Sequence, residues 1–186
     1  MFTIIALGNH GDEYKHTRHN VAWIICDEFI SSERWQENKY AESELASTRI
    51  ADTDVLFVKP QTFMNDSGRV LPYLMKTYGT SVENLIVVQD EIDLPLGIIK
   101  ISYDRGDGGH NGVKSIMTVS GTKEFIRVRV GVSILDDTGT LRKPDVLGNF
   151  SKEDLAMITS VVAPRVAKII ETLALQGKDK AMTLYN

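Results

Sequence analysis

Histidines, primary amides and acidic residues gather in four short segments of this chain, and these groups could do chemistry. Imidazole titrates near neutral pH and can take a proton from water, while a carboxylate on its other nitrogen fixes the tautomer. Side-chain amides can donate hydrogen bonds to a developing oxyanion without titrating. Such a set suits hydrolysis by a histidine-activated water. The four segments are residues 8–20, 59–65, 89–95 and 108–112.

Metal binding, a reactive cysteine and a nucleotide-binding loop have weaker support from these residues. His16 and His19 form an H-x-x-H pair that lacks a third metal ligand. The acidic residues at 90–93 could hold Mg²⁺, but such clusters are commonly solvated loop residues. Cys26 lies in an apolar run and is expected in a helix core. Residues 106–112 match neither phosphate-binding glycine pattern, which argues against a nucleotide loop.

Strands and helices alternate along the chain, which favours an α/β fold. Each of the four segments lies at or near the end of an expected strand, where open α/β sheets bind ligands. We expect strands at 2–7, 44–50, 54–59, 85–89, 98–103 and 126–132. We expect helices at 20–30, from a cap at Asp66 or Ser67 to Gly79, after 106–112, and from Ser151 to Gln176.

Length and composition predict one domain, residues 1–186. The formal net charge is −4, so an RNA partner would need a local basic face. Residues 94–149 offer one, with eight basic and six acidic side chains. A single cysteine excludes a disulfide framework. With neither a signal peptide nor a membrane span, we expect a cytoplasmic protein.

The four segments, in this order, resemble the bacterial-type peptidyl-tRNA hydrolase family. The resemblance covers nearly the whole chain, and Val146-Leu147-Gly148 adds a weaker match. Its most specific pieces are Thr17-Arg18-His19-Asn20, Gln61-Thr62-Phe63-Met64-Asn65-Asp66-Ser67-Gly68, Asp90-Glu91-Ile92-Asp93-Leu94-Pro95 and Gly108-Gly109-His110-Asn111-Gly112. It implies a single α/β domain with a mixed, mostly parallel sheet flanked by helices.

The resemblance also implies a reaction, the cleavage of the ester between a peptide and the 3′ ribose of tRNA. By this analogy His19 is the general base for water, Asp90 pairs with it, and Asn9 helps to stabilise the oxyanion. The residues that bind substrate or line the cleft are Tyr14, Phe63, Met64, Asn65, His110 and Asn111. The implied partner is the acceptor end and nascent peptide of peptidyl-tRNA, bound by a monomer without metal or cofactor.

Two departures from the family pattern concern substrate binding. His10 stands where the family usually has proline, and Ser102 stands where well-studied members have a lysine. That lysine acts with the arginine matching Arg129 on the tRNA 5′ phosphate. Lys100 or Arg105 could therefore substitute for it in this chain.

Two alternatives to the esterase remain open from the sequence. An RNA-binding paralogue with weak catalysis fits the altered phosphate contact and the net acidity. A metal-dependent peptidase could use His16, His19 and the acidic residues. Turnover of an N-blocked aminoacyl-tRNA separates the first from an esterase, and sensitivity to a chelator separates the second.

Overall fold

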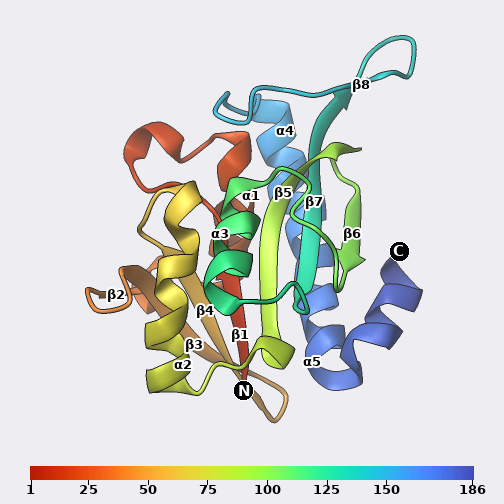
Figure 1. The fold of residues 1–186 in the computed structure, drawn as a ribbon. Coiled ribbons are helices and arrows are strands. Elements are labelled where there is room, and N and C mark those ends of the chain that lie inside the picture. The colour runs from red at the N-terminus through yellow and green to blue at the C-terminus, as the bar shows by residue number, and fades with distance from the viewer.

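The computed structural model describes residues 1–186 and is built on one eight-stranded sheet (Figure 1). Its strand order is β2-β3-β4-β1-β5-β7-β6, with β8 paired to β7. The strands are β1 (Phe2–Ala6), β2 (Gln36–Asn38), β3 (Ser43–Ile50), β4 (Thr53–Pro60), β5 (Leu85–Pro95), β6 (Ile99–Ser102), β7 (Ile126–Leu135) and β8 (Leu141–Arg142). The expected α/β fold with a mixed sheet is confirmed, and parallel pairing joins the four central strands β4, β1, β5 and β7.

Helices cover both faces of this sheet. The α-helices are α1 (Val21–Phe29), α2 (Leu71–Tyr78), α3 (Asn111–Ser120), α4 (Lys152–Met157) and α5 (Ala163–Tyr185). The shorter 3-10 turns are η1 (Asp12–Tyr14), η2 (Arg18–Asn20), η3 (Ser32–Arg34), η4 (Met64–Val70) and η5 (Val82–Asn84), and η6 (Ile158–Val162) is a π-helical turn. Figure 1 shows α2 and α3 in front of the sheet and α5 behind it. No helix is both long and apolar enough to span a membrane.

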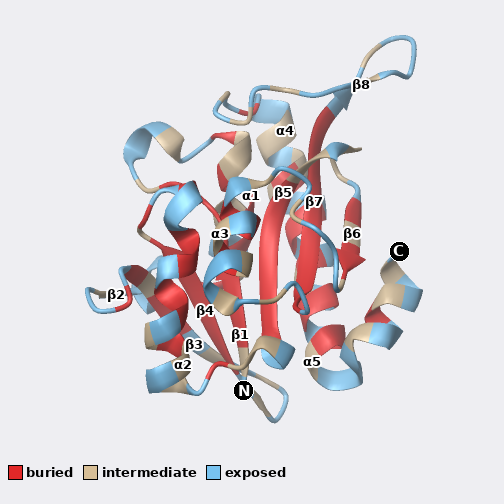
Figure 2. Ribbon diagram, in the orientation of Figure 1, coloured by how far each residue is buried: buried red, intermediate tan, exposed pale blue.

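Alternating side chains of the central strands build two cores, one on each face. In β1, Ile4 enters the core that contains α1 and α5, whereas Ile5 enters the core that contains α2 and α3. In β5, Val88 enters the core with α1 and α5, and Val87 enters the core with α2 and α3. Strands buried on both faces are continuously apolar, which explains their sequence and the red centre of the sheet in Figure 2.

The order of connections brings three segments together near the carboxyl end of β1. The chain leaves β1 through α1 and returns through β2 and β3 to β4 on one side of β1, then passes through α2 to β5 on its other side. A ligand crevice forms where successive crossovers leave a strand in opposite directions. The segments that follow β1, β4 and β5 therefore converge at one place.

Local sequence signals account for some element ends and fail at others. Ser151 caps α4 in a reciprocal capping box with Asp154, as expected. Gly79, at φ 66°, ends α2 as expected. The predicted cap at Asp66 or Ser67 is wrong, because these residues lie inside η4, which begins at Met64, and α2 starts only at Leu71.

The predicted C-terminal helix is interrupted. The interruption is the π-helical turn η6 between α4 and α5. Gly177, at φ 79° and ψ 174°, ends the regular helix directly after Gln176, where its end was expected. The residues after this kink fold back to the edge of the sheet. There the side chain of Asn186 accepts from the Ile101 N–H at 2.7 Å and donates to the Ile101 carbonyl at 2.9 Å. This pair occupies part of the exposed edge of β6.

Candidate active site

His19 is held at the carboxyl end of the sheet by its main chain. It lies in η2, directly before α1, and its N–H donates to the Val146 carbonyl at 2.9 Å. The neighbouring Arg18 N–H donates to Gly148 O at 3.1 Å, and the Arg18 guanidinium reaches the same carbonyl. The 146–150 segment therefore fixes the position from which the imidazole of His19 projects.

Asp90 lies on β5, and its carboxylate meets His19. The distance from His19 Nδ1 to Asp90 Oδ1 is 2.7 Å, and the Asp90 side chain is only 2% exposed. Burial alone would raise the pKa of Asp90, but the charge that His110 can carry and the hydrogen bonds from His110 and His19 outweigh it. The net result is a pKa held below the ordinary value, so the carboxylate stays ionised.

His110 donates to the same oxygen as His19. Its Nε2 lies 2.9 Å from Asp90 Oδ1, while its Nδ1 accepts from the Val113 N–H at 3.4 Å as the cap of α3. In the neutral form of His110, these two contacts place the proton on Nε2 and leave Nδ1 as the acceptor. The same reasoning places the His19 proton on Nδ1, which leaves its Nε2 as a free acceptor.

Asn20, directly after His19 in the chain, ties the main chain of Asn9 to η2. Asn20 Oδ1 accepts from the Asn9 N–H at 2.9 Å, and Asn20 Nδ2 donates to the Asn9 carbonyl at 2.8 Å. The Asn9 side chain in turn accepts from the Met64 N–H through Oδ1 at 2.8 Å. That bond identifies the oxygen end of the amide and leaves Asn9 Nδ2 as the free donor.

Met64 closes a circuit of contacts around the site. A Cβ atom at Gly112 would lie 2.5 Å from Met64 Sδ and 3.3 Å from His110 Cε1, so the methionine packs against the start of α3. The site circuit comprises Asn9, Asn20, His19, Asp90, His110 and Met64. It joins segments that lie more than one hundred positions apart in the chain, and Asn20 is a member that the sequence prediction did not single out. Its position directly after His19 was the available signal.

The cavity beside this circuit is about 240 Å³ and is lined by both histidines and Asp90. Asn111 and the glycine-rich loop from Asp107 to Gly109 form another wall. Phe63 is 51% exposed and Asn65 is also exposed, next to Met64 in the chain. Tyr14 lies half-buried on η1. The cavity wall does not include Asn9, Tyr14, Phe63, Met64 or Asn65.

The same three side chains are the candidate ligands for a metal ion. The two histidine nitrogens and the carboxylate oxygen lie within 4.8 Å of one another. Tetrahedral zinc at its usual bond lengths would bring such atoms to about 3.3 Å apart. Both histidine rings would have to turn away from their hydrogen bonds, so the arrangement suits proton transfer better than metal binding. His16 is exposed and does not join this cluster.

The cations expected to contact RNA differ in whether their side chains already bind other groups of the protein. Arg129 Nε binds Glu91 Oε2 at 2.8 Å, with both side chains largely buried. Lys100 Nζ contacts the main-chain oxygen of Asn186. Arg105 is exposed and forms no ion pair.

Arg127 positions the loop that carries Arg105. Its guanidinium donates to the carbonyls of Arg105 and Gly106 at 3.1 and 3.0 Å. Burial, followed by the charges of Arg129 and Arg105, lowers the pKa of Arg127 to about 10, so it remains charged at neutral pH. The main chain at Arg105 is thus anchored while its side chain stays in solvent.

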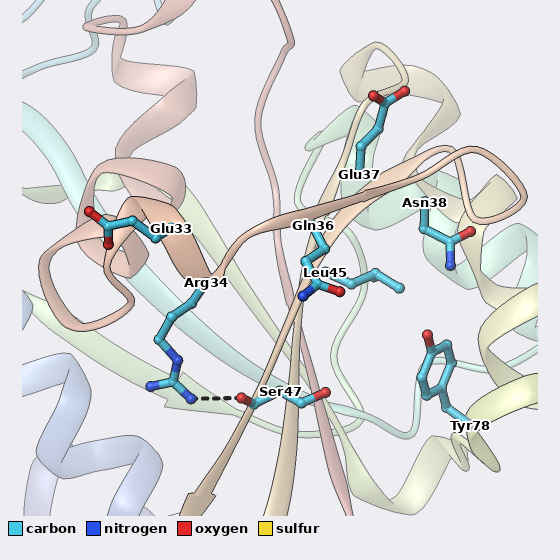
Figure 3. Close-up of a pocket in the computed structure, with 8 residues that line it drawn as sticks. All are labelled: Glu33, Arg34, Gln36, Glu37, Asn38, Leu45, Ser47 and Tyr78. Atoms are coloured by element: carbon cyan, nitrogen blue, oxygen red, sulfur yellow. Dashed lines mark hydrogen bonds between the residues drawn. The ribbon is translucent and has the colours of Figure 1, made fainter.

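A second hollow of about 370 Å³ lies between η3, β2, β3 and the end of α2 (Figure 3). Arg34 there donates to the main-chain oxygen of Ser47 at 2.7 Å. Tyr78 and two glutamates also line it, but it contains no histidine. It lacks the base and paired carboxylate found beside β5.

Known proteins share both the sequence and the fold. The family model described as Peptidyl-tRNA hydrolase matches residues 3–186. Peptidyl-tRNA hydrolase of Thermotoga petrophila is 40% identical over 185 residues, covering 98% of this chain and 96% of the relative. That of Bdellovibrio bacteriovorus is 40% identical over 190 residues, with both chains fully covered. The crystal structure of peptidyl-tRNA hydrolase from Acinetobacter baumannii has a TM-score of 0.83 at 26% identity, covering 100% of this chain and 94% of that one. The chain therefore belongs to the peptidyl-tRNA hydrolase family.

Proposed function

We propose that this chain hydrolyses the ester between a peptide and the 3′ ribose of tRNA, with His19 as general base. The observation that carries the proposal is the 2.7 Å contact between His19 Nδ1 and the buried Asp90 carboxylate. The family relationship supports the substrate class. The released tRNA returns to translation.

The contacts support the following sequence of steps. His19 Nε2 takes a proton from water, and the water oxygen attacks the ester carbonyl. Asp90 stabilises the imidazolium that forms. Asn9 Nδ2 donates to the oxyanion. When the tetrahedral intermediate collapses, the bond to the 3′ oxygen breaks and His19 returns the proton to that oxygen. The products are a peptide acid and free tRNA, and this route uses no metal or organic cofactor.

His110 acts in this scheme by positioning Asp90. It shares Oδ1 with His19, so two imidazole rings hold one carboxylate oxygen. Tyr14, Phe63, Met64, Asn65 and Asn111 are proposed to hold the substrate around this centre. Asn65 and Asn111 are exposed amides, so their donors are available to a peptide or a ribose.

The acceptor end of tRNA is proposed to lie over the face that carries Arg129, Lys100 and Arg105. Phosphate contacts supply most of the affinity of proteins for nucleic acids. Arg105 is the free cation among the three, because Arg129 and Lys100 already contact groups of the protein. We further propose that residues 1–186 act as one domain, as a monomer, in the cytoplasm where translation supplies peptidyl-tRNA.

A single-turnover assay on an N-acetylated aminoacyl-tRNA tests this function. The wild-type protein should release tRNA with EDTA present, and His19→Ala should be slower by about 10²–10⁴-fold because the base is lost. His16→Ala is a matched control, since this exposed histidine lies outside the site circuit. Binding without turnover by the wild type would favour the RNA-binding paralogue, and loss of activity in EDTA would favour a metal enzyme. Near-normal turnover of purified His19→Ala would refute the assignment of the base.

A further inference from the structure

His10 faces Phe63 at the edge of the site circuit. Their ring centroids are 4.8 Å apart, and the ring planes are inclined by 41°. This separation and tilt are within the range in which aromatic rings attract one another. The imidazole is half-buried, whereas Phe63 is 51% exposed. A large apolar ring that remains half in solvent is available to a ligand.

The ring pair lies directly beside a hydrogen bond of the circuit. Asn9 Oδ1 accepts from the Met64 N–H, and His10 and Phe63 are the immediate sequence neighbours of those two residues. Asn9 thus contacts Met64, and the next residue, His10, contacts Phe63. The hydrogen bond holds the main chain at Met64 and does not involve the Phe63 side chain.

We propose that His10 is a positioning residue that holds the exposed Phe63 ring in place for the substrate. The inference rests on the proposed function and concerns the contribution of Phe63 to substrate binding. No hydrogen bond joins His10 to His19 or to Asp90. Losing its ring should therefore weaken binding and leave the chemical step unchanged.

Steady-state kinetics on one N-acetylated aminoacyl-tRNA test this role. His10→Ala should raise KM by about 2–10-fold, the loss expected when one ring–ring contact is removed, with kcat unchanged. His10→Phe keeps an aromatic ring and should restore KM to within about twofold. His16→Ala, in the same loop, should match the wild type. Thermal melting of each variant establishes that it is folded.

Three results would overturn the proposal. They are an unchanged KM in His10→Ala, a loss in kcat in place of KM, and a His10→Phe variant as poor as His10→Ala. The last result would mean that a ring nitrogen of His10, and not its packing on Phe63, is what matters. Failure of the proposed function is distinguishable from all three, because the wild-type protein would then not hydrolyse the substrate.

Discussion

His19 Nδ1 lies 2.7 Å from Asp90 Oδ1, although 71 positions separate the two residues in the chain. The contact forms because β1 and β5 are parallel neighbours whose carboxyl ends meet at one edge of the sheet. It orients the imidazole so that Nε2 is left without a proton and can act as a base. The geometry of the sheet thus supplies the chemistry that neither residue has alone.

Replacing Asp90 by asparagine should remove most of the activity. The amide keeps the shape of the side chain but cannot stabilise an imidazolium by charge, and it can present an N–H to the ring and reverse its tautomer. We expect kcat to fall by about 10²–10⁴-fold in Asp90→Asn. Asp93→Asn, at an exposed acid three residues away that pairs with Lys143, should retain near-normal kcat. Equal kcat values for the two variants would contradict the role of Asp90.

The depressed pKa of Asp90 also predicts a dependence of stability on pH. A carboxyl group with a lower pKa in the folded state than its ordinary value of 3.8 stabilises the fold above that value. The contribution is then lost as pH falls toward the folded-state pKa. Urea unfolding gives the free energy of unfolding of the wild type and of Asp90→Asn. The contribution of the Asp90 carboxylate to the difference between these two free energies should be constant from pH 5 upward and should narrow below about pH 4. A difference that widens below about pH 4 would contradict the sign of the shift.

The sequence predicts those parts of the structure whose causes are local. The strands expected from Phe2 and from Leu85 and the cap at Ser151 arise from neighbours in the chain, and these expectations are confirmed. The cap predicted at Asp66 failed because tertiary packing decides there. A Cβ at Gly68 would lie 2.3 Å from the Ser115 carbonyl, so η4 is pressed against α3 and a tight 3-10 turn replaces a normal helix start.

The candidate site shows the same limit. Family motifs were sufficient to expect His19, Asp90 and Asn9 together, and their geometry is compatible with that pairing. The sharing of one Asp90 oxygen by His19 and His110 could not be predicted, because it depends on where the cap of α3 lies relative to β5. The ion pair between Arg129 and Glu91 depends in the same way on side chains of adjacent strands.

The variant His110→Asn should keep the cap of α3 and remove the hydrogen bond from His110 to Asp90. Asparagine is a preferred helix cap and should still satisfy an N–H at the start of α3, but its shorter side chain cannot reach Asp90. We expect kcat to fall by about tenfold, as one hydrogen bond to the carboxylate is lost, with little change in melting temperature. Measuring both quantities together is essential, since full activity in a normally folded variant would show that the contact with Asp90 is dispensable.

Cys26 should be inert in the folded protein. It is fully buried in α1, and burial raises the pKa of its thiol to about 12. The thiolate is the reactive form, so modification by a thiol reagent at pH 8 should be about 10³-fold slower than for a free cysteine. Reaction in 8 M urea provides the control, because the chain has a single cysteine and any difference reports its burial. Rapid labelling without denaturant would show that α1 is not packed as described.

Arg105 and Arg129 should affect RNA binding differently. Arg105→Ala removes an exposed, unpaired cation and should reduce the slope of log affinity against log salt by about one unit. Arg129→Ala leaves the largely buried carboxylate of Glu91 without its partner and should lower the melting temperature as well. Arg49→Ala, at an exposed arginine on β3 paired with Asp54, is the control and should change neither slope nor affinity. Affinity for a deacylated tRNA measured over a salt series decides the matter: an unchanged slope in Arg105→Ala would exclude this residue as the phosphate contact.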